Sequence, residues 1–515
     1  MEKQARFLDY FDPSKTPRDI QVQASDWSQN NWYTSKVLAL NMSCGAGKSH
    51  YAMSIAEWNA AQGLTTSYIT PQKLLQGQLQ RDFKHINMLM GAENYVCLEH
   101  PNNDKMNADV SKSLGLCFKC RKKQECPYFS HKLRAYNEYI TIFNPMSYLF
   151  LKKSVTKDNE QQTIYDADTI IIDECQSVAS MLAGAFDFKV WRFEHRYAKN
   201  ISASVPALVA SLEQYQNTLD ALFNSDLKVE ERMKVMRTIH KLDMVLKGLK
   251  KEPEMFVVEE TVEKYRNQNM DCLKVRVTAP PAWLLKWFFG SAAHIVLMSG
   301  TLFKSMPKEL GFTDFAFLDL PSPIDKELRR FIPVSAVSNS HSNVNAVVEL
   351  AEAIIKIANR HPNERGIVLA SYEQAKSLKG YLDGHTRFVF HDRLDKSKVI
   401  EKFMQGEGSD RIAVLSGAWE GLDAKDDLCR FIIITKCLFP NMGDKLVLRK
   451  RDLDKTWYDL ETMKYVIQGA NRASRHQADF SVTYMLDANF MPLYTRTKQH
   501  LPKYFCESIK WGQRL

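Results

Sequence analysis

The feature that most constrains the fold is "VLALNMSCGAGKSHYAMSIAEWNA" at residues 37–60, a short apolar strand, a glycine-containing loop and a helix. Glycines let backbone N–H groups curl around phosphates, and the helix N-terminus adds partial positive charge. Gly45, Gly47, Lys48 and Ser49 therefore predict a phosphate-binding loop, with the lysine on the outer phosphates and the serine near Mg²⁺. Taken alone, this loop could also be a glycine turn before a helix.

A second motif, "TIIIDEC" at 169–175, is a β-branched run that ends in two acids. Asp173 is predicted to coordinate Mg²⁺, and Glu174 to polarise the attacking water. The alternative is an acidic helix N-cap, because Asp and Glu favour that position. Together the two motifs predict ATP hydrolysis with ATP and Mg²⁺ bound.

Far downstream, "QGANRASRHQADF" places Arg472 and Arg475 three residues apart, which puts them on one face if the segment is helical. They could form surface salt bridges. In the functional interpretation they are arginine fingers from a second domain, which stabilise charge on the transferred phosphoryl group.

Strand and helix patterns alternate along most of the chain, which favours parallel sheets with crossover helices. The expected strands form two groups, so we expect two α/β domains. The first group is "TTSYIT", "YITIFN" and "TIIIDE"; the second is "GIVLAS", "RFVFH", "IAVLSG", "FIIIT" and "SVTYMLD".

Residues 186–285 differ, because apolar side chains recur there at three- and four-residue steps, which is typical of amphipathic helices. We expect a helical insertion between the two domains. The stripe contains Leu208, Leu212, Tyr215, Leu219, Leu222, Met233, Met236, Ile239, Leu242, Val245 and Leu249.

Composition permits several functions and demands none. The 515 residues are 45% apolar and 25% charged, and the longest apolar stretches are strand-sized, so we expect no membrane span. The N-terminus has no apolar signal-like region, and we expect a cytoplasmic, DNA-associated protein. The net charge of +9 allows nucleic-acid binding through counterion release but does not require it.

Four of the ten cysteines cluster with the spacing C-x19-C-x2-C-x5-C-P: Cys97, Cys117, Cys120 and Cys126. Such a cluster in a reduced compartment indicates a metal site. The spacing alone favours zinc, although thiolate sites suit iron–sulfur clusters too.

Several motifs in a collinear order resemble the iron–sulfur group of superfamily 2 helicases, which includes XPD and DinG. The resemblance runs from about residue 18 to residue 490. It rests on "RDIQ" (18–21), "TPQKLLQGQ" (70–78), "DECQ" (173–176), "MSGTL" (298–302), "LPSPID", "WEGLDAKDDLCRFIIITKCLFP" (419–440) and "QGANRASRH" (468–476).

The resemblance implies further site residues. Nucleotide-pocket roles fall on Arg18, Gln21, Gly421 and Asp423, and a catalytic role on Gln468. Contacts with single-stranded DNA fall on Thr70, Pro71, Lys73 and Gln76.

It also implies that the four cysteines hold a 4Fe–4S cluster. The cysteine segment carries the basic residues Lys119, Arg121, Lys122 and Lys123. One interpretation is a solvated face; beside a nucleic-acid motor they are predicted to contact phosphates near the duplex fork.

The implied fold class is α/β, with two RecA-like motor domains and with an iron–sulfur cluster domain and a helical arch domain inserted in the first. The expected boundaries are 1–84, 139–185 and 286–325 for motor domain 1, 85–138 for the iron–sulfur domain, 186–285 for the arch and 326–515 for motor domain 2.

The sequence departs from the family pattern at four positions. Met42 replaces a small residue, Cys175 and Gln176 replace the Ala-His of the DEAH motif, and Asn471 replaces a glycine before the first arginine. None removes a group that performs the chemistry.

The resulting prediction is an ATP-dependent DNA helicase that moves 5′ to 3′ on single-stranded DNA. Its expected partners are single-stranded DNA and DNA forks, and it is expected to act as a monomeric motor, with any loader or repair partner undefined. One alternative is a translocase or remodeller of DNA or RNA that does not unwind processively. Another is a zinc-stabilised binding module switched by nucleotide.

Overall fold

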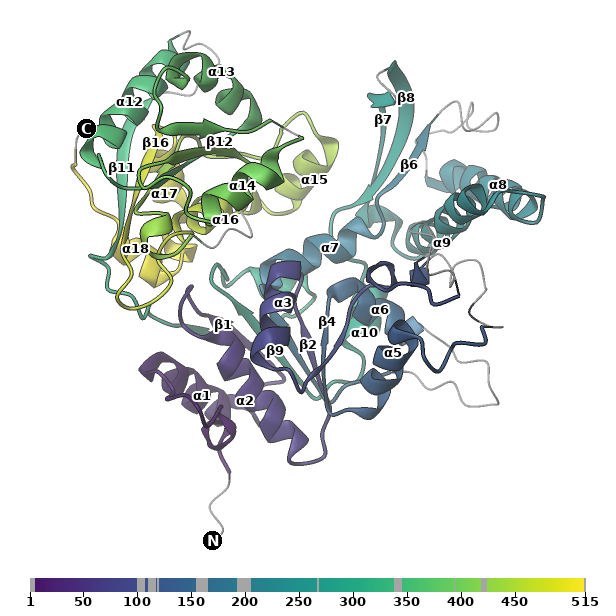
Figure 1. The fold of residues 1–515 in the computed structure, drawn as a ribbon. Helices are drawn as coiled ribbons and strands as arrows, with labels where there is room; N and C mark the ends of the chain where they lie inside the picture. The colour runs from purple at the N-terminus through teal and green to yellow at the C-terminus, as the bar shows by residue number, and fades with distance from the viewer. Residues whose placement is uncertain are drawn as a thin grey trace.

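A computed structural model shows two α/β domains and a third, inserted unit (Figure 1). The residues that it describes are 5–99, 107–109, 117, 120–153, 165–191, 205–265, 268–337, 345–392, 394–417 and 424–513. The first domain lies at the bottom of the view, the second at the upper left and the inserted unit at the upper right.

The first domain is built on a seven-stranded sheet in which every neighbouring pair is parallel. In spatial order the strands are β10 (Ala316–Asp319), β1 (Val37–Asn41), β9 (His294–Ser299), β5 (Thr169–Asp173), β2 (Thr66–Ile69), β4 (Ile140–Phe143) and β3 (Asn87–Leu89).

Helices cover both faces of this sheet, so its strands are apolar on both sides. Leu38 and Leu40 of β1 face a core shared with α1 and α2. Val37 and Ala39 face the opposite core, shared with α6, α7 and α10. The helices of this domain are α1 (Asp19–Asn31), α2 (Lys48–Ala60), α3 (Lys73–Asp82), α5 (Pro127–Asn137), α6 (Pro145–Lys153), α7 (Val178–Gly184), α10 (Ala282–Phe289) and α11 (Met306–Glu309).

The second domain has a six-stranded parallel sheet. Its spatial order is β11 (Arg329–Val337), β16 (Ser481–Asp487), β15 (Phe431–Ile434), β12 (Gly366–Ala370), β14 (Ile412–Ser416) and β13 (Phe388–Phe390). All the strands expected from the sequence in both groups are present, and the prediction of two α/β domains is confirmed.

One face of the second sheet packs on α12 and α13, the other on α16, α17 and α18. The latter core is continuous with one core of the first domain. The helices are α12 (Ala346–Arg360), α13 (Tyr372–Leu382), α14 (Lys396–Met404), α15 (Lys445–Leu453), α16 (Trp457–Ala470), α17 (Phe490–Thr497) and α18 (Lys503–Ser508).

The inserted unit follows α7 in the chain. Its apolar stripe forms two helices, α8 (Val205–Phe223) and α9 (Val229–Lys251), as predicted. The expectation of a helical insertion is correct only in part, because β6 (Phe188–Trp191), β8 (Gln268–Val277) and β7 (Phe256–Tyr265) form an antiparallel sheet in that order. The β-branched residues of "VVEETVEKY" at 257–265 are the strand signal that the helical stripe obscured.

Two elements lie across the expected boundaries. Strand β3 falls within 85–138 but forms the edge of the first sheet beside β4. Helix α10 spans position 286, and its Phe288 packs edge-on against Tyr148 of α6. Both elements therefore belong with the first domain.

The inserted unit also contacts the second domain. The guanidinium of Arg276 on β8 donates to both carboxylate oxygens of Asp444, at 2.8 and 2.7 Å, and to Glu259 on β7 at 2.9 Å. Asp444 is the N-cap of α15 and accepts from the N–H of Leu446. Because Arg276 balances the charge, the pKa of Asp444 lies below its ordinary value. We call this group the Arg276–Asp444 tether.

No helix in the described ranges combines the length and the apolar character needed to cross a lipid bilayer.

The fold makes a stability prediction. Ile433 in β15 is fully buried between helices, and Ile433→Ala should lower the free energy of unfolding by about 2–5 kcal/mol, because it leaves a cavity. Lys376→Ala, at an exposed position on α13, serves as control. It should change the free energy of unfolding by about 0.5 kcal/mol or less. Chemical denaturation of both variants measures the difference, and equal stabilities would contradict this account of the core.

Candidate nucleotide-binding site

A cavity of about 920 Å³ lies between the two α/β domains. Residues of both domains line it, including most of those predicted to bind nucleotide. These are Arg18, Gln21, Gly45, Gly47, Lys48, Ser49, Asp173 and Glu174 from the first domain and Gln468, Arg472 and Arg475 from the second.

The phosphate loop joins β1 to α2, as the sequence pattern predicts. Gly45 and Gly47 have φ values of +79° and +77°, which favour glycine, and Gly47 is the N-cap of α2. A Cβ on Gly45 would lie 2.5 Å from the carbonyl oxygen of Arg475, and a Cβ on Gly47 2.4 Å from Nε2 of Gln21. The two glycines thus allow both the curl of the loop and its close packing.

Arg18 and Gln21, at the start of α1, hold this loop in place. Gln21 Nε2 donates to the carbonyl of Gly47 at 2.8 Å, and its Oε1 accepts from the N–H of Arg18 at 2.9 Å. The guanidinium of Arg18 donates to the carbonyl of Gly45. Both residues therefore line the cavity and brace the loop from outside.

Three ionisable side chains, the buried Asp173 and the partly buried Lys48 and Glu174, meet at the floor of the cavity. Lys48 Nζ lies 3.8 Å from Glu174 Oε1 and donates to the carbonyl of Met42 at 3.3 Å. Burial acts to lower the pKa of Lys48, but the charges of Glu174, Cys44 and Asp173 outweigh it and raise that pKa. Burial raises the pKa of Asp173 to about 6 despite the nearby Lys48. Lys48 is therefore held as a cation that can meet anionic phosphates.

Hydrogen bonds orient the two acids. Tyr68 OH donates to Asp173 Oδ2 at 3.0 Å, and Asp173 Oδ1 accepts from the N–H of Glu174 at 2.9 Å. Glu174 has φ +54°, a left-handed conformation that is costly for a residue other than glycine. Gln176, where the DEAH motif has histidine, donates to Glu174 Oε2 at 2.7 Å. The departure from the family pattern thus supplies an amide that orients this carboxylate.

The second domain forms the facing wall. Gln468 lies near the end of α16, and its Oε1 is buried and accepts no hydrogen bond from the described residues. A ligand or water in the cavity would satisfy it. The loop after α16 carries Arg472 and Arg475, and the Arg475 backbone is the part that approaches Gly45.

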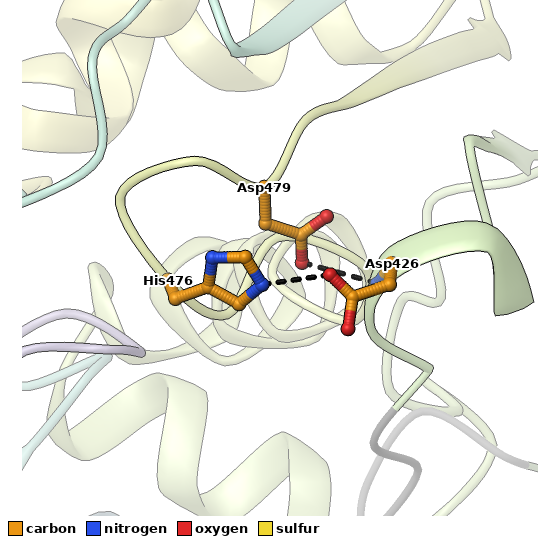
Figure 2. Close-up of side chains that lie close together, drawn as sticks. All are labelled: Asp426, His476 and Asp479. Atoms are coloured by element: carbon orange, nitrogen blue, oxygen red, sulfur yellow. Dashed lines mark hydrogen bonds and ion pairs between the residues drawn. The ribbon is translucent and has the colours of Figure 1, made fainter.

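A cluster of Asp426, His476 and Asp479 braces this arginine loop (Figure 2). Asp479 Oδ2 accepts from the N–H of Arg475 at 2.9 Å, and Asp479 Oδ1 accepts from the Arg430 guanidinium at 2.9 Å. His476 Nε2 lies 2.7 Å from Asp426 Oδ1. The ligand atoms lie close enough to hold a cation, but Arg430 already balances the Asp479 charge. We interpret the cluster as a structural brace for Arg475.

The segment predicted to touch DNA is only partly exposed. Thr70 and Gln76 are buried, and Gln76 Nε2 donates to the Thr70 carbonyl at 3.0 Å. Lys73 is exposed at the start of α3, and Pro71 is partly exposed. The side chains of Thr70 and Gln76 thus shape this loop from inside and do not reach its surface.

The cysteine segment extends from the first sheet near β3. Cys97 is buried and Cys126 is the N-cap of α5, followed by Pro127 at the first helical position. No three described cysteine sulfurs lie within 4.8 Å of one another, whereas four thiolates on one Zn²⁺ would lie about 3.8 Å apart.

Among the basic residues of this segment, Arg121 and Lys122 are exposed and Lys123 is partly buried over the Phe129 ring. Lys122 Nζ donates to the Leu98 carbonyl at 3.1 Å. Three predicted site residues, Lys119, Gly421 and Asp423, lie outside the described residues.

Sequence reasoning missed three residues of the cavity wall, namely Phe11, Lys15 and His50, and assigned no role to Thr301 of the "MSGTL" motif, which also lines it. His50 directly follows the phosphate loop and Lys15 precedes Arg18, so proximity to known motifs could have indicated them. Phe11 has no such signal, because only the fold brings it to α2.

Comparison with known proteins supports the architecture. The family described as "Helicase C-terminal domain" matches residues 354–508, and "Type III restriction enzyme, res subunit" matches 14–201. A solved structure named "XPD_Helicase" superposes with a TM-score of 0.62 at 14% identity over 96% of this chain and 99% of that one. A second solved structure, named "Structure of S. tokodaii Xpd4", superposes with a TM-score of 0.56 at 16% identity and covers 96% of this chain and 99% of that one. The chain thus has the fold of proteins with two RecA-like α/β domains.

Curated relatives narrow this class. "ATP-dependent DNA helicase CHL1" of Eremothecium gossypii is 23% identical over 51% of this chain and 41% of that protein. "ATP-dependent DNA helicase YoaA" of Haemophilus influenzae is 24% identical over 39% of this chain and 32% of that protein. The matches span less than half of each relative. With the motif order and the fold, they support a resemblance to the XPD/DinG-like proteins of helicase superfamily 2.

Substitutions at two glycines test the close packing of the phosphate loop against the Arg475 backbone. Gly45→Ala would place a Cβ against the Arg475 carbonyl and should reduce ATP turnover about tenfold or more, since the loop and the arginines must separate. Gly63→Ala is the matched control: it has φ +74° but no atom within 4 Å of its Cβ position. Both should lose about 1 kcal/mol of stability. Steady-state turnover and thermal unfolding of the two variants check this, and equal losses of turnover would contradict the packing argument.

Proposed function

We propose that the protein is an ATP-dependent DNA helicase. The observation that carries this proposal is the shared cavity, in which Lys48, Asp173 and Glu174 of one RecA-like domain face Arg472 and Arg475 of the other. A site divided between two domains links hydrolysis to their relative movement, which motion along a polymer requires.

In this proposal each side chain has a definite task. Lys48 contacts the outer phosphates, and Ser49 and Asp173 would hold Mg²⁺, which neutralises phosphate charge when bound. Glu174, oriented by Gln176, accepts a proton from the attacking water. Arg472 and Arg475 stabilise the charge on the transferred phosphoryl group. The buried Oε1 of Gln468 is available to a water or phosphate group.

The relatives support DNA as the polymer, because CHL1 and YoaA are named ATP-dependent DNA helicases. We infer that single-stranded DNA and forks are the substrates and that translocation runs 5′ to 3′. The exposed Lys73, Arg121 and Lys122 offer cations for phosphate contacts.

We further propose that Cys97, Cys117, Cys120 and Cys126 hold a 4Fe–4S cluster. Cysteine thiolates are the usual ligands of such clusters, and the set lies in the sequence between the phosphate loop and the Asp173–Glu174 pair, as in the XPD/DinG group. The cluster would cross-link this segment where it leaves the first sheet, which is a structural role.

The decisive experiment measures ATP hydrolysis and strand separation together. We expect single-stranded DNA to stimulate ATPase activity and 5′-tailed duplexes to be opened in preference to 3′-tailed ones. Lys48→Ala should reduce turnover about a hundredfold or more, because a cation aimed at the transition-state charge is lost, while circular dichroism stays unchanged.

RNA substrates of the same design are the comparison. Stimulated ATPase without opening of either DNA tail would contradict the helicase proposal and favour a translocase. Turnover unaffected by Lys48→Ala would contradict the assigned site.

The cysteine proposal predicts a brown, anaerobically purified protein with iron and acid-labile sulfide. Cys126→Ser should lose most of the iron and impair unwinding more than ATP binding. Cys272→Ser, which alters a buried thiol of β8 outside the set, should keep wild-type iron content. A colourless protein that contains zinc would contradict this assignment.

A further inference from the structure

The last described helix, α18, lies at the junction of the two motor domains. Its Tyr504 belongs to the second domain, yet the residue is 1% exposed and lies between loops of both domains. Nothing in the motif pattern of the sequence marks this residue.

The Tyr504 hydroxyl joins the two domains directly. It donates to the carbonyl of Gly300 in the first domain at 2.5 Å and accepts from Asn471 Nδ2 in the second at 2.8 Å. Gly300 follows β9 and Asn471 is the C-cap of α16, directly before Arg472. Both Gly300 and Asn471 line the nucleotide cavity. One hydroxyl thus connects opposite walls of that cavity.

Other contacts fix the position of Tyr504. The Arg329 guanidinium lies 5.5 Å from the centre of its ring and also donates to its backbone carbonyl. The N–H of Lys503 donates to Asp319 Oδ2 of β10 at 3.0 Å, so the helix is also bonded to the first sheet. Burial raises the pKa of Tyr504 far above its ordinary value, so the hydroxyl remains a donor.

Asn471 stands where the XPD/DinG pattern has glycine, and glycine has no side chain that could donate to Tyr504. The pairing gives a physical reason for this departure. The amide group of Asn471 anchors the first residue of the arginine loop, and the cluster around Asp479 anchors the other end through the Arg475 N–H.

We propose that Tyr504 and Asn471 are positioning residues, which hold the loop of Arg472 and Arg475 in register with the Gly300 wall of the cavity. This inference rests on the proposed ATP hydrolysis at that cavity. Neither residue touches the reacting phosphates; both act through the arginines.

Kinetics of Tyr504→Phe, Asn471→Gly and the double variant test the proposal. Tyr504→Phe removes both hydrogen bonds of the hydroxyl, and Asn471→Gly removes the one between Asn471 and Tyr504. Each single change should lower kcat roughly three- to tenfold. The KM for ATP should change less than twofold, because the arginines act mainly on transition-state charge. The double variant should resemble the single ones, since the two side chains act as one unit.

Tyr484→Phe is the matched control. Tyr484 is also buried in the second domain, and its hydroxyl lies 3.0 Å from His361 Nε2. It should keep the wild-type kcat. Wild-type kcat in both Tyr504→Phe and Asn471→Gly, or losses that simply multiply in the double variant, would overturn the proposal.

Hydrogen exchange of amides 467–476 provides a readout that does not depend on turnover. Exchange should be several-fold faster in Tyr504→Phe and Asn471→Gly than in wild type or Tyr484→Phe, and unchanged exchange would overturn the proposal. If the wild-type protein failed to hydrolyse ATP, the proposed function would fail, whereas this measurement would still decide whether the hydroxyl holds the loop.

Discussion

The structure depends on the burial of Lys48 beside Asp173 and Glu174 at the carboxyl ends of parallel strands. Removing these charges from water is costly unless opposite charges and hydrogen bonds compensate. Tyr68, Gln176 and the Met42 carbonyl supply those bonds. The arrangement leaves a cation pointing toward a cavity, which is the condition for binding an anion there.

The second domain completes this site through backbone contacts as well as side chains. The Arg475 carbonyl rests where only a glycine at position 45 leaves room. Its N–H is held by Asp479, which is itself paired with Arg430. The arginines are thus placed by a chain of contacts that reaches into the second sheet, and a shift of that sheet would move them.

Local patterns in the sequence predicted a large part of this. The phosphate loop, the acids after β5 and the eight expected strands depend on neighbouring residues, and a parallel sheet buried on both faces leaves an apolar run that is easy to recognise.

Long-range features could not be predicted in this way. Strand β3 has only three residues, and its place in the sheet follows from pairing with β4. Thr70 was expected at a DNA surface, yet the residue is fully buried. Tyr504 lies some 200 residues from its partner Gly300, and no local pattern reports such a pairing.

The Arg276–Asp444 tether has a mechanical consequence. The inserted unit is continuous in the chain with the first domain, and its Arg276 binds Asp444, the N-cap of α15 in the second domain. The three parts therefore contact one another pairwise. A movement of the second domain relative to the first must either break the Arg276–Asp444 tether or displace the inserted unit with it.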